Sequence, residues 1–142
     1  ISHATYEQQE NGKVVFEGIV AMARACLDNG IPVGLGTDTG CPYITHYDMW
    51  RELCYFVKYC GVTPSFALHS ATLLNAQLAG IDDVTGSIQP GKYADMLVCG
   101  RDPLADLTAL RTLDMVIKSG CRVERPQVKK MPYVERELDK FL

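Results

Sequence analysis

The chain has 142 residues, of which 47% are hydrophobic and 22% charged, and its 14 basic and 17 acidic side chains leave a net charge of −3. These values are typical of one globular domain and do not favour a nucleic acid as partner. No apolar stretch reaches the ~20 residues of a membrane span. Residues 1–5 carry neither the basic nor the apolar part of a secretory signal.

Six cysteines are spread along the chain without a Cys-x-x-Cys pair. Three of them lie inside apolar periodic segments, where a free thiol behaves as a small hydrophobic side chain. We therefore expect reduced thiols in a cytoplasmic protein, and neither a disulfide framework nor a cysteine-based zinc site. The chain does not begin with Met, and we expect it to be a piece of a longer protein.

The first segments of the chain predict a helix followed by a buried strand. Residues 1–13 are polar and end in Asn11-Gly12, a turn signal. Gly30 suits the left-handed cap of a helix, and residues 31–36 form an apolar run typical of a strand covered on both faces. This order indicates the end of an α/β unit in a parallel sheet. The helix before Gly30 is predicted by apolar residues at three- and four-residue steps: Val15, Ile19, Met22, Ala23 and Cys26.

Further helices are predicted up to residue 80. The first covers residues 48–60. Thr63 and Pro64 are a typical N-cap and first helical residue for the next helix. Thr72 is then expected to cap a separate short helix over residues 73–79.

From residue 81 onward the pattern changes to short strands and turns. Pro90-Gly91 suits the centre of a type II turn. We expect strands over residues 93–99, 114–118 and 121–124, the last two joined by a tight hairpin at Ser119-Gly120. A last helix is expected over residues 134–142, with a solvated face formed by Glu135, Arg136, Glu137, Asp139 and Lys140. The expected organisation is residues 1–80, 81–125 and 126–142, with a linker-like start to the third part.

Several stretches, in this order, resemble the metal-dependent amidohydrolase superfamily. Residues 31–38 (IPVGLGTD) are similar to its eighth barrel strand, and residues 67–76 (ALHSATLLNA) to the helix pair that follows. Residues 86–98 (GSIQPGKYADMLV) closely resemble its return into a small β-sandwich, and residues 102–104 and 115–120 continue the order. The nearest group is that of imidazolonepropionase and Xaa-Pro dipeptidase-like enzymes. The fold that this resemblance implies is α/β: the final α/β units of an incomplete (β/α)8 barrel, followed by part of a small β-sandwich.

The resemblance also implies a divalent metal, with zinc expected, in the intact enzyme. In the family, an HxH pair, a Lys or Glu and two further His complete that site, and none of them can be matched here. The chain has only His3, His46 and His69, and no two are at ligand spacing. Because a (β/α)8 barrel needs ~250 residues, we interpret the chain as the C-terminal portion of such an enzyme. Alone, it is expected to be inactive and to bind no metal tightly.

Asp38 is the candidate catalytic and metal-binding residue. The resemblance places it at the C-terminal end of a barrel strand, where it would contact the metal, accept a proton from the metal-bound water and pass it to the leaving amine. The alternative is a turn residue that ends the strand. Thr37, Thr39 and His46 are candidate substrate-binding residues. Their alternatives are hydroxyls that bond local backbone groups and a surface or helix-capping histidine.

The activity that the resemblance implies is hydrolysis of a C–N bond, in an amide, a cyclic amide or a dipeptide. The implied partners are a small-molecule or dipeptide-like substrate and the missing barrel segment or another copy of the chain, without nucleic acid or membrane. The rival hypothesis is a non-catalytic module that associates through an exposed strand edge and carries neither metal nor activity. A further alternative is an unrelated small α/β protein in which the Gly-Thr-Asp sequence is accidental.

Overall fold

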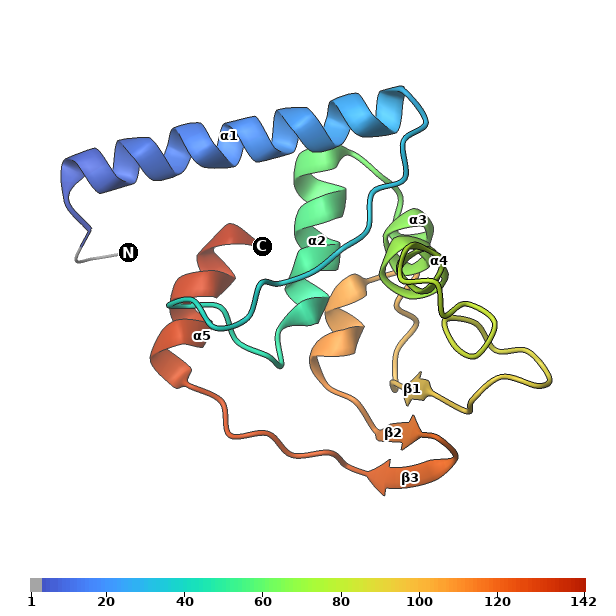
Figure 1. Ribbon diagram of the computed structural model, residues 1–142. Coiled ribbons are helices and arrows are strands. Elements are labelled where there is room, and N and C mark those ends of the chain that lie inside the picture. The colour runs from blue at the N-terminus through green and yellow to red at the C-terminus, as the bar shows by residue number, and fades with distance from the viewer. Residues whose placement is uncertain (1–3) are drawn as a thin grey trace.

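The computed structural model describes residues 4–142, so His3 lies outside the described residues. Figure 1 shows a group of helices beside a small sheet. The long helix α1 (Tyr6–Asp28) lies across one end of α2 (Met49–Cys60). The remaining elements follow in chain order: α3 (Pro64–His69), a π-helical turn (Ser70–Leu74), α4 (Asn75–Leu78), β1 (Met96–Val98), a 3₁₀ helix (Leu107–Arg111), β2 (Met115–Lys118), β3 (Cys121–Glu124), α5 (Pro132–Leu138) and a last 3₁₀ turn (Asp139–Phe141).

Helix α1 begins at Tyr6, well before the apolar pattern that predicted it. Thr5 and Gln8 form a capping box: the Thr5 hydroxyl accepts from the Gln8 N–H at 3.2 Å, and the Gln8 side chain accepts from the Thr5 N–H at 2.9 Å. Asn11-Gly12 therefore lies inside the helix, and the predicted turn is wrong. The cap and the long helix that follows outweigh the ~1 kcal/mol by which Gly disfavours a helix interior. No residue of α1 is buried.

Residues 31–36 are extended but pair with no strand of the described chain, so the predicted buried strand is wrong in its pairing and its burial. Extended backbone becomes a strand only when a neighbouring segment pairs with its N–H and C=O groups. Here the side chain of Asn75 does this for one residue. The Leu35 N–H donates to Asn75 Oδ1 at 3.0 Å, and Asn75 Nδ2 donates to the Leu35 carbonyl at 2.8 Å.

The helices from residue 49 to residue 78 follow the predicted start and stop signals with one exception. Gly61 ends α2 in the left-handed conformation, with φ of 76°. Thr63 caps α3 by accepting from the Phe66 N–H at 3.2 Å, with Pro64 as first helical residue. The separate helix expected after Thr72 is wrong, because the chain stays helical through a π-helical turn. The Thr72 hydroxyl donates to the Leu68 carbonyl at 2.7 Å and so caps nothing.

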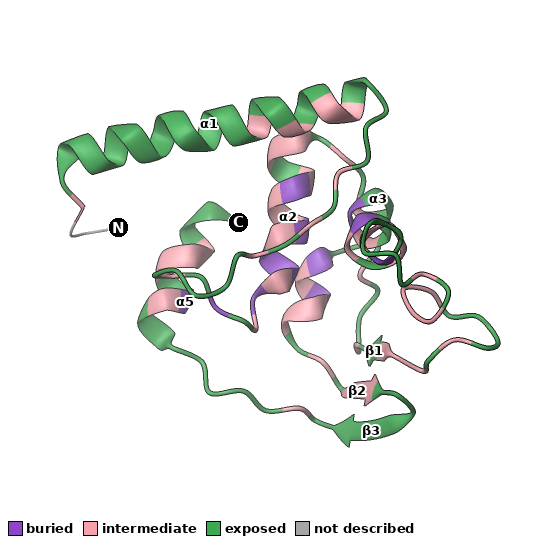
Figure 2. Ribbon diagram, viewed as in Figure 1, coloured by how far each residue is buried: buried purple, intermediate pink, exposed green. Residues whose placement is uncertain are grey.

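The core is small and lies between α2, α3 and the 3₁₀ helix. Leu53 and Phe56 of α2 meet Ala67 of α3 and Leu107, and none of these four is more than 6% exposed. Figure 2 shows that the buried residues gather at these helices, whereas α1 and β3 are exposed over most of their surface. The fold therefore leaves a large apolar area uncovered, most of all on α1.

The sheet is antiparallel, in the order β1-β2-β3. Ser119 and Gly120 have φ of 50° and 80° and form the predicted hairpin between β2 and β3. Gly91 has φ of 93°, and the Lys92 N–H donates to the Gln89 carbonyl at 3.3 Å, as the predicted type II turn requires. Strand β1 covers only residues 96–98 of the predicted 93–99.

Two remaining expectations concern the membrane and the cysteines. None of the helices formed by residues 4–142 is both long and apolar enough to cross a membrane. All six cysteines lie in the described part of the chain, and all six are free thiols.

Candidate active site

Asp38 lies directly after the extended residues 31–36, on the loop that leads to α2. It is exposed, and its φ of 50° places it in the left-handed region, which Asp adopts more readily than most residues. Within residues 4–142 its carboxylate forms no hydrogen bond or ion pair. The loop therefore presents a carboxylate that is free to bind something outside this chain.

Thr37 and Thr39 flank Asp38 and bond each other, with their Oγ1 atoms 2.6 Å apart. In such a pair one hydroxyl donates and the other accepts. The accepting hydroxyl keeps its own hydrogen, which is available to a further acceptor. The two threonines thus stiffen the turn around Asp38 without occupying its carboxylate.

Two cavities border this loop, and together they contain three of the four candidate residues. A cavity of about 550 Å³ is lined by Thr39 and His46, together with Cys41, Tyr47, Lys129 and other residues. A smaller one of about 150 Å³ is lined by Thr37, with Arg51 and Glu52. Asp38 lines neither cavity. The structure therefore brings Thr39 and His46 into one cavity and leaves Thr37 and Asp38 outside it.

A buried charge cluster joins α2 to the C-terminal helix, and the sequence patterns gave no sign of it. The Arg51 side chain is 2% exposed. Its guanidinium lies 2.7 Å from Asp139 Oδ1 and 3.2 Å from Glu135 Oε2. Arg111 also contacts these two carboxylates, at 3.0 and 3.1 Å. The solvated face expected for the last helix is therefore wrong for Glu135, which is 7% exposed, and for half-buried Asp139, because both turn toward two arginines.

The same cluster fixes the end of the Asp38 loop to α2. The Oδ1 atom of Asp48 lies 3.5 Å from Arg51 Nε. Its carboxylate accepts from the Thr45 hydroxyl at 2.6 Å and from the Trp50 indole N–H at 3.1 Å. The segment that carries Asp38 is thus held, at its far end, by buried polar contacts.

Burial and opposite charges set the pKa values in this cluster. Burial acts to lower the pKa of Arg51, but the hydrogen bond to Asp139 and the nearby carboxylates outweigh it and raise that pKa. Burial acts to raise the pKa of Asp139, and the bonds from Arg51 and Arg111 outweigh it, so the pKa of Asp139 is lowered. Glu52, which lines the smaller cavity, has no such compensation, and burial raises its pKa.

The side chains of residues 4–142 do not by themselves fit a metal ion. No group of three His, Cys, Asp or Glu residues in the described part of the chain lies together in a way that could hold one. Asp38 supplies a hard oxygen donor, but a tightly held zinc needs three or more protein ligands. Any metal site that includes Asp38 therefore takes its other ligands from outside residues 4–142.

Residues 11–123 match the amidohydrolase family, which is most of the chain. The chain therefore belongs to the amidohydrolase family, and this confirms the resemblance in the sequence. Its length and its mixed α/β fold are those of a fragment of an amidohydrolase superfamily protein.

Its curated relatives include several imidazolonepropionases. That of Geobacillus thermodenitrificans is 32% identical over 106 residues, which are 70% of this chain and 24% of the relative. N-acetylgalactosamine-6-phosphate deacetylase of Escherichia coli O157:H7 is 46% identical over 41 residues, 29% of this chain and 11% of that protein.

Solved structures place the chain near prolidases. A Bifidobacterium longum protein that is provisionally assigned as a prolidase is 42% identical, with a TM-score of 0.93, over 98% of this chain and 34% of that one. A Xaa-Pro dipeptidase with bound methionine in its active site is 35% identical, with a TM-score of 0.68, over 75% of this chain and 25% of that one. The chain thus spans about a quarter to a third of the length of most of these proteins.

Proposed function

We propose that this chain is the C-terminal portion of an amidohydrolase that hydrolyses a C–N bond, and that Asp38 moves the proton in that reaction. The observation that carries the proposal is the carboxylate of Asp38, directly after residues 31–36, which is exposed and has no partner within residues 4–142. Membership of the amidohydrolase family supports the reaction class. Relatives named imidazolonepropionase and Xaa-Pro dipeptidase support the type of bond.

Asp38 has the chemistry for both proton transfers. When water attacks a carbonyl carbon it must lose a proton, and the nitrogen of the broken bond must gain one before it leaves. A carboxylate without competing partners can accept the first proton and deliver it to the nitrogen. One residue then acts as base and afterwards as acid, and ends the reaction in the state in which it began.

A divalent metal is part of this proposal, with zinc as the expected ion. Amidohydrolases of this superfamily generally use divalent metals. Asp38 is the ligand that we propose from this chain, and the described residues hold no group of ligands that could bind a metal by themselves. The other ligands would come from the rest of the protein, so the isolated chain is expected to be inactive.

The substrate that we propose is a small amide, a cyclic amide or a dipeptide. We propose that this substrate binds at Thr39 and His46, because both line one cavity beside the Asp38 loop. Thr37 lines the smaller neighbouring cavity and bonds Thr39, so it would contact the substrate from there. These three residues are the proposed substrate contacts.

The exposed face of α1 is proposed to be covered by the rest of the barrel in the intact protein. Val15, Ile19 and Met22 are 55% to 65% exposed there, more than a helix of a finished core would leave. Since the chain spans at most about a third of its solved relatives, enough polypeptide exists elsewhere to cover this face. In this arrangement residues 1–80 close the barrel, residues 81–125 belong to a β-sandwich, and residues 126–142 form the tail.

The proposal is tested on the natural full-length protein that contains this chain. Its hydrolysis of Xaa-Pro dipeptides, other dipeptides and cyclic amides is measured, followed by the same assay on Asp38→Asn. We expect turnover of one of these classes, and a kcat lower by several orders of magnitude in Asp38→Asn, because the amide cannot accept the proton.

Asp83→Asn is the matched control, because Asp83 is also exposed but lies far along the chain from the Asp38 loop. It should keep normal turnover. Near-normal turnover by a folded Asp38→Asn protein would contradict the role of Asp38. No hydrolysis of any C–N substrate by the natural protein would favour the rival, a non-catalytic association module.

A further inference from the structure

We propose that the cavity of about 550 Å³ beside the Asp38 loop is a carboxylate-binding subsite for the substrate, and that Lys129 determines this specificity. This inference rests on the proposed function and adds to it the charge of the substrate. It also assigns a role to the segment between β3 and α5, which the sequence indicated only as a linker.

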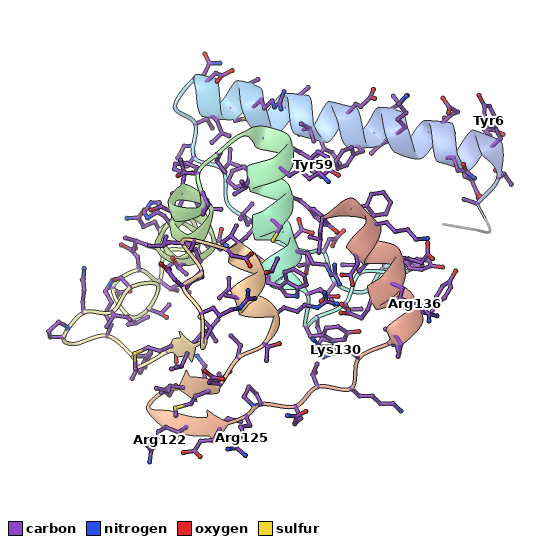
Figure 3. The ribbon with its side chains drawn as sticks, turned by 180° about the vertical axis from the view of Figure 1, so that it is seen from behind. Tyr6, Tyr59, Arg122, Arg125, Lys130 and Arg136 are labelled. Carbon is purple, nitrogen blue, oxygen red and sulfur yellow. The ribbon has the colours of Figure 1, made fainter. Side chains whose placement is uncertain are left out.

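The C-terminal segment is fastened across the Asp38 loop rather than hanging free. The Tyr47 hydroxyl accepts a hydrogen bond from the Met131 N–H at 3.0 Å. The rings of Tyr43 and Tyr133 lie 6.3 Å apart, next to this point. Figure 3 shows Lys130 on the same segment, between β3 and the start of α5. Lys129 is therefore held near the loop by contacts on the residues that follow it.

The charge of this cavity favours an anion. Lys129 and His46 line it together with the Thr39 hydroxyl, and no Asp or Glu is among its lining residues. Within residues 4–142, Lys129 forms no ion pair or hydrogen bond. By contrast, Arg51 and Arg111 are already paired with Glu135 and Asp139. Among the described residues, Lys129 is thus a cation without a partner, and it lines a cavity that no Asp or Glu lines.

The size and the remaining lining favour a small molecule over a macromolecule. A volume of about 550 Å³ is within the range of small-ligand pockets. Ile44 and Met131 add apolar surface to the lining, suited to the body of an amino acid or a heterocycle. Thr39, next to Asp38 in the chain, connects the cavity to the proposed reaction centre. A small substrate that carries a carboxylate suits the volume of the cavity, its partly apolar lining and its position next to Asp38.

The adjacent residue provides a matched control. Lys130 also lies on the exposed tail, but it lines a different cavity, and its Nζ atom donates to the Arg111 carbonyl at 3.4 Å. Lys129→Gln and Lys130→Gln therefore remove the same charge from neighbouring positions and differ in the cavity that they affect. Lys129→Arg keeps the charge and should retain the function.

The experiment uses the natural full-length protein and two substrates, a Xaa-Pro dipeptide with a free carboxylate and the same dipeptide as its C-terminal amide. We expect Lys129→Gln to raise KM for the free acid about tenfold or more, and to change KM for the amide less than about twofold. Lys130→Gln and Lys129→Arg should stay near the wild type on both. Binding of N-acetyl-L-proline, measured by calorimetry, should weaken by a similar factor in Lys129→Gln only.

The outcomes separate this inference from the proposed function. Equal loss on both substrates, or no loss on either, would overturn the role of Lys129 while hydrolysis itself stands. Binding of N-acetyl-L-proline that depends on Lys129, in a protein that hydrolyses none of the dipeptide, amide and cyclic amide substrates named above, would support the subsite and contradict the proposed reaction. Absence of hydrolysis of every one of these substrate classes, together with absence of Lys129-dependent binding, would contradict both.

Discussion

The side chain of Asn75 forms two hydrogen bonds with the backbone of Leu35, one to its N–H and one to its C=O. A residue near the end of the helical run thus occupies the place that a neighbouring strand would take. The contact fixes the extended segment that ends at Asp38. A Cβ at Gly34 would lie 2.5 Å from Asn75 Oδ1, so a larger residue there would displace the Asn75 side chain.

Asn75→Ala tests this contact. Both backbone groups of Leu35 would lose their partner in a half-buried position, so we expect the free energy of unfolding to fall by about 1–3 kcal/mol. Urea denaturation measures the change. Asn11→Ala, on the exposed face of α1, should stay within about 0.5 kcal/mol of the wild type. Equal stability of the two variants would show that Asn75 does not hold the segment.

Gly86→Ala tests the close approach between the turn after α4 and the π-helical turn. The added Cβ would lie 2.5 Å from Ala76 Cβ and 3.2 Å from Leu73 Cα, at a φ of 87°. We expect a loss of about 2–4 kcal/mol, from backbone strain together with overpacking. Gly91→Ala has a similar φ of 93° but no atom within 4 Å, so it isolates the strain and should cost about 1 kcal/mol. A thermal or urea melt that finds the two equal would exclude the packing contribution.

Arg51→Met tests the buried charge cluster. It would remove the cation from Asp48 and leave Glu135 and Asp139 with Arg111 alone, and breaking one side of a buried ion pair costs about 3–5 kcal/mol. Arg136→Met, on the exposed side of α5, is the control and should change stability by less than about 0.5 kcal/mol. Stability of Arg51→Met near that of the control would mean that the cluster contributes nothing net.

The same cluster predicts how stability changes in acid. The pKa of Asp139 is lower in the folded protein than in the unfolded chain, because Arg51 and Arg111 stabilise its carboxylate. Its contribution is therefore complete above the unfolded pKa of about 3.9 and is lost as pH falls through the folded pKa. We expect Asp139→Asn to be less stable than the wild type at pH 6, with the difference shrinking below about pH 4. Denaturation midpoints across this range measure it, and a difference that grows in acid would contradict the assignment.

Local signals in the sequence predicted many of the turns and caps. Gly61, the Thr63–Pro64 cap and the Ser119-Gly120 hairpin each depend on backbone preferences of a few adjacent residues. The structure has all three where the sequence placed them. The family resemblance likewise depended on ordered local motifs, and the match over residues 11–123 confirmed it.

Features that depend on distant contacts were not predictable in this way. Glu135 has the pattern of a solvated residue and becomes buried because Arg51, 84 residues away in the chain, reaches it. The segment 31–36 has the composition of a strand, yet composition does not supply the partner that would make it one. Lys129 looked like part of a linker, since only the folded tail places it beside His46 and Thr39.

The intact mass of the natural protein, measured together with its metal content, shows whether this chain is part of a metal-dependent barrel enzyme. A (β/α)8 barrel needs ~250 residues, so we predict a mass roughly three times the 15.7 kDa of this chain. We also predict about one or two divalent metal ions per polypeptide. A natural protein of 15.7 kDa without bound metal would contradict the proposal, because neither the rest of the barrel nor the other metal ligands would then be present.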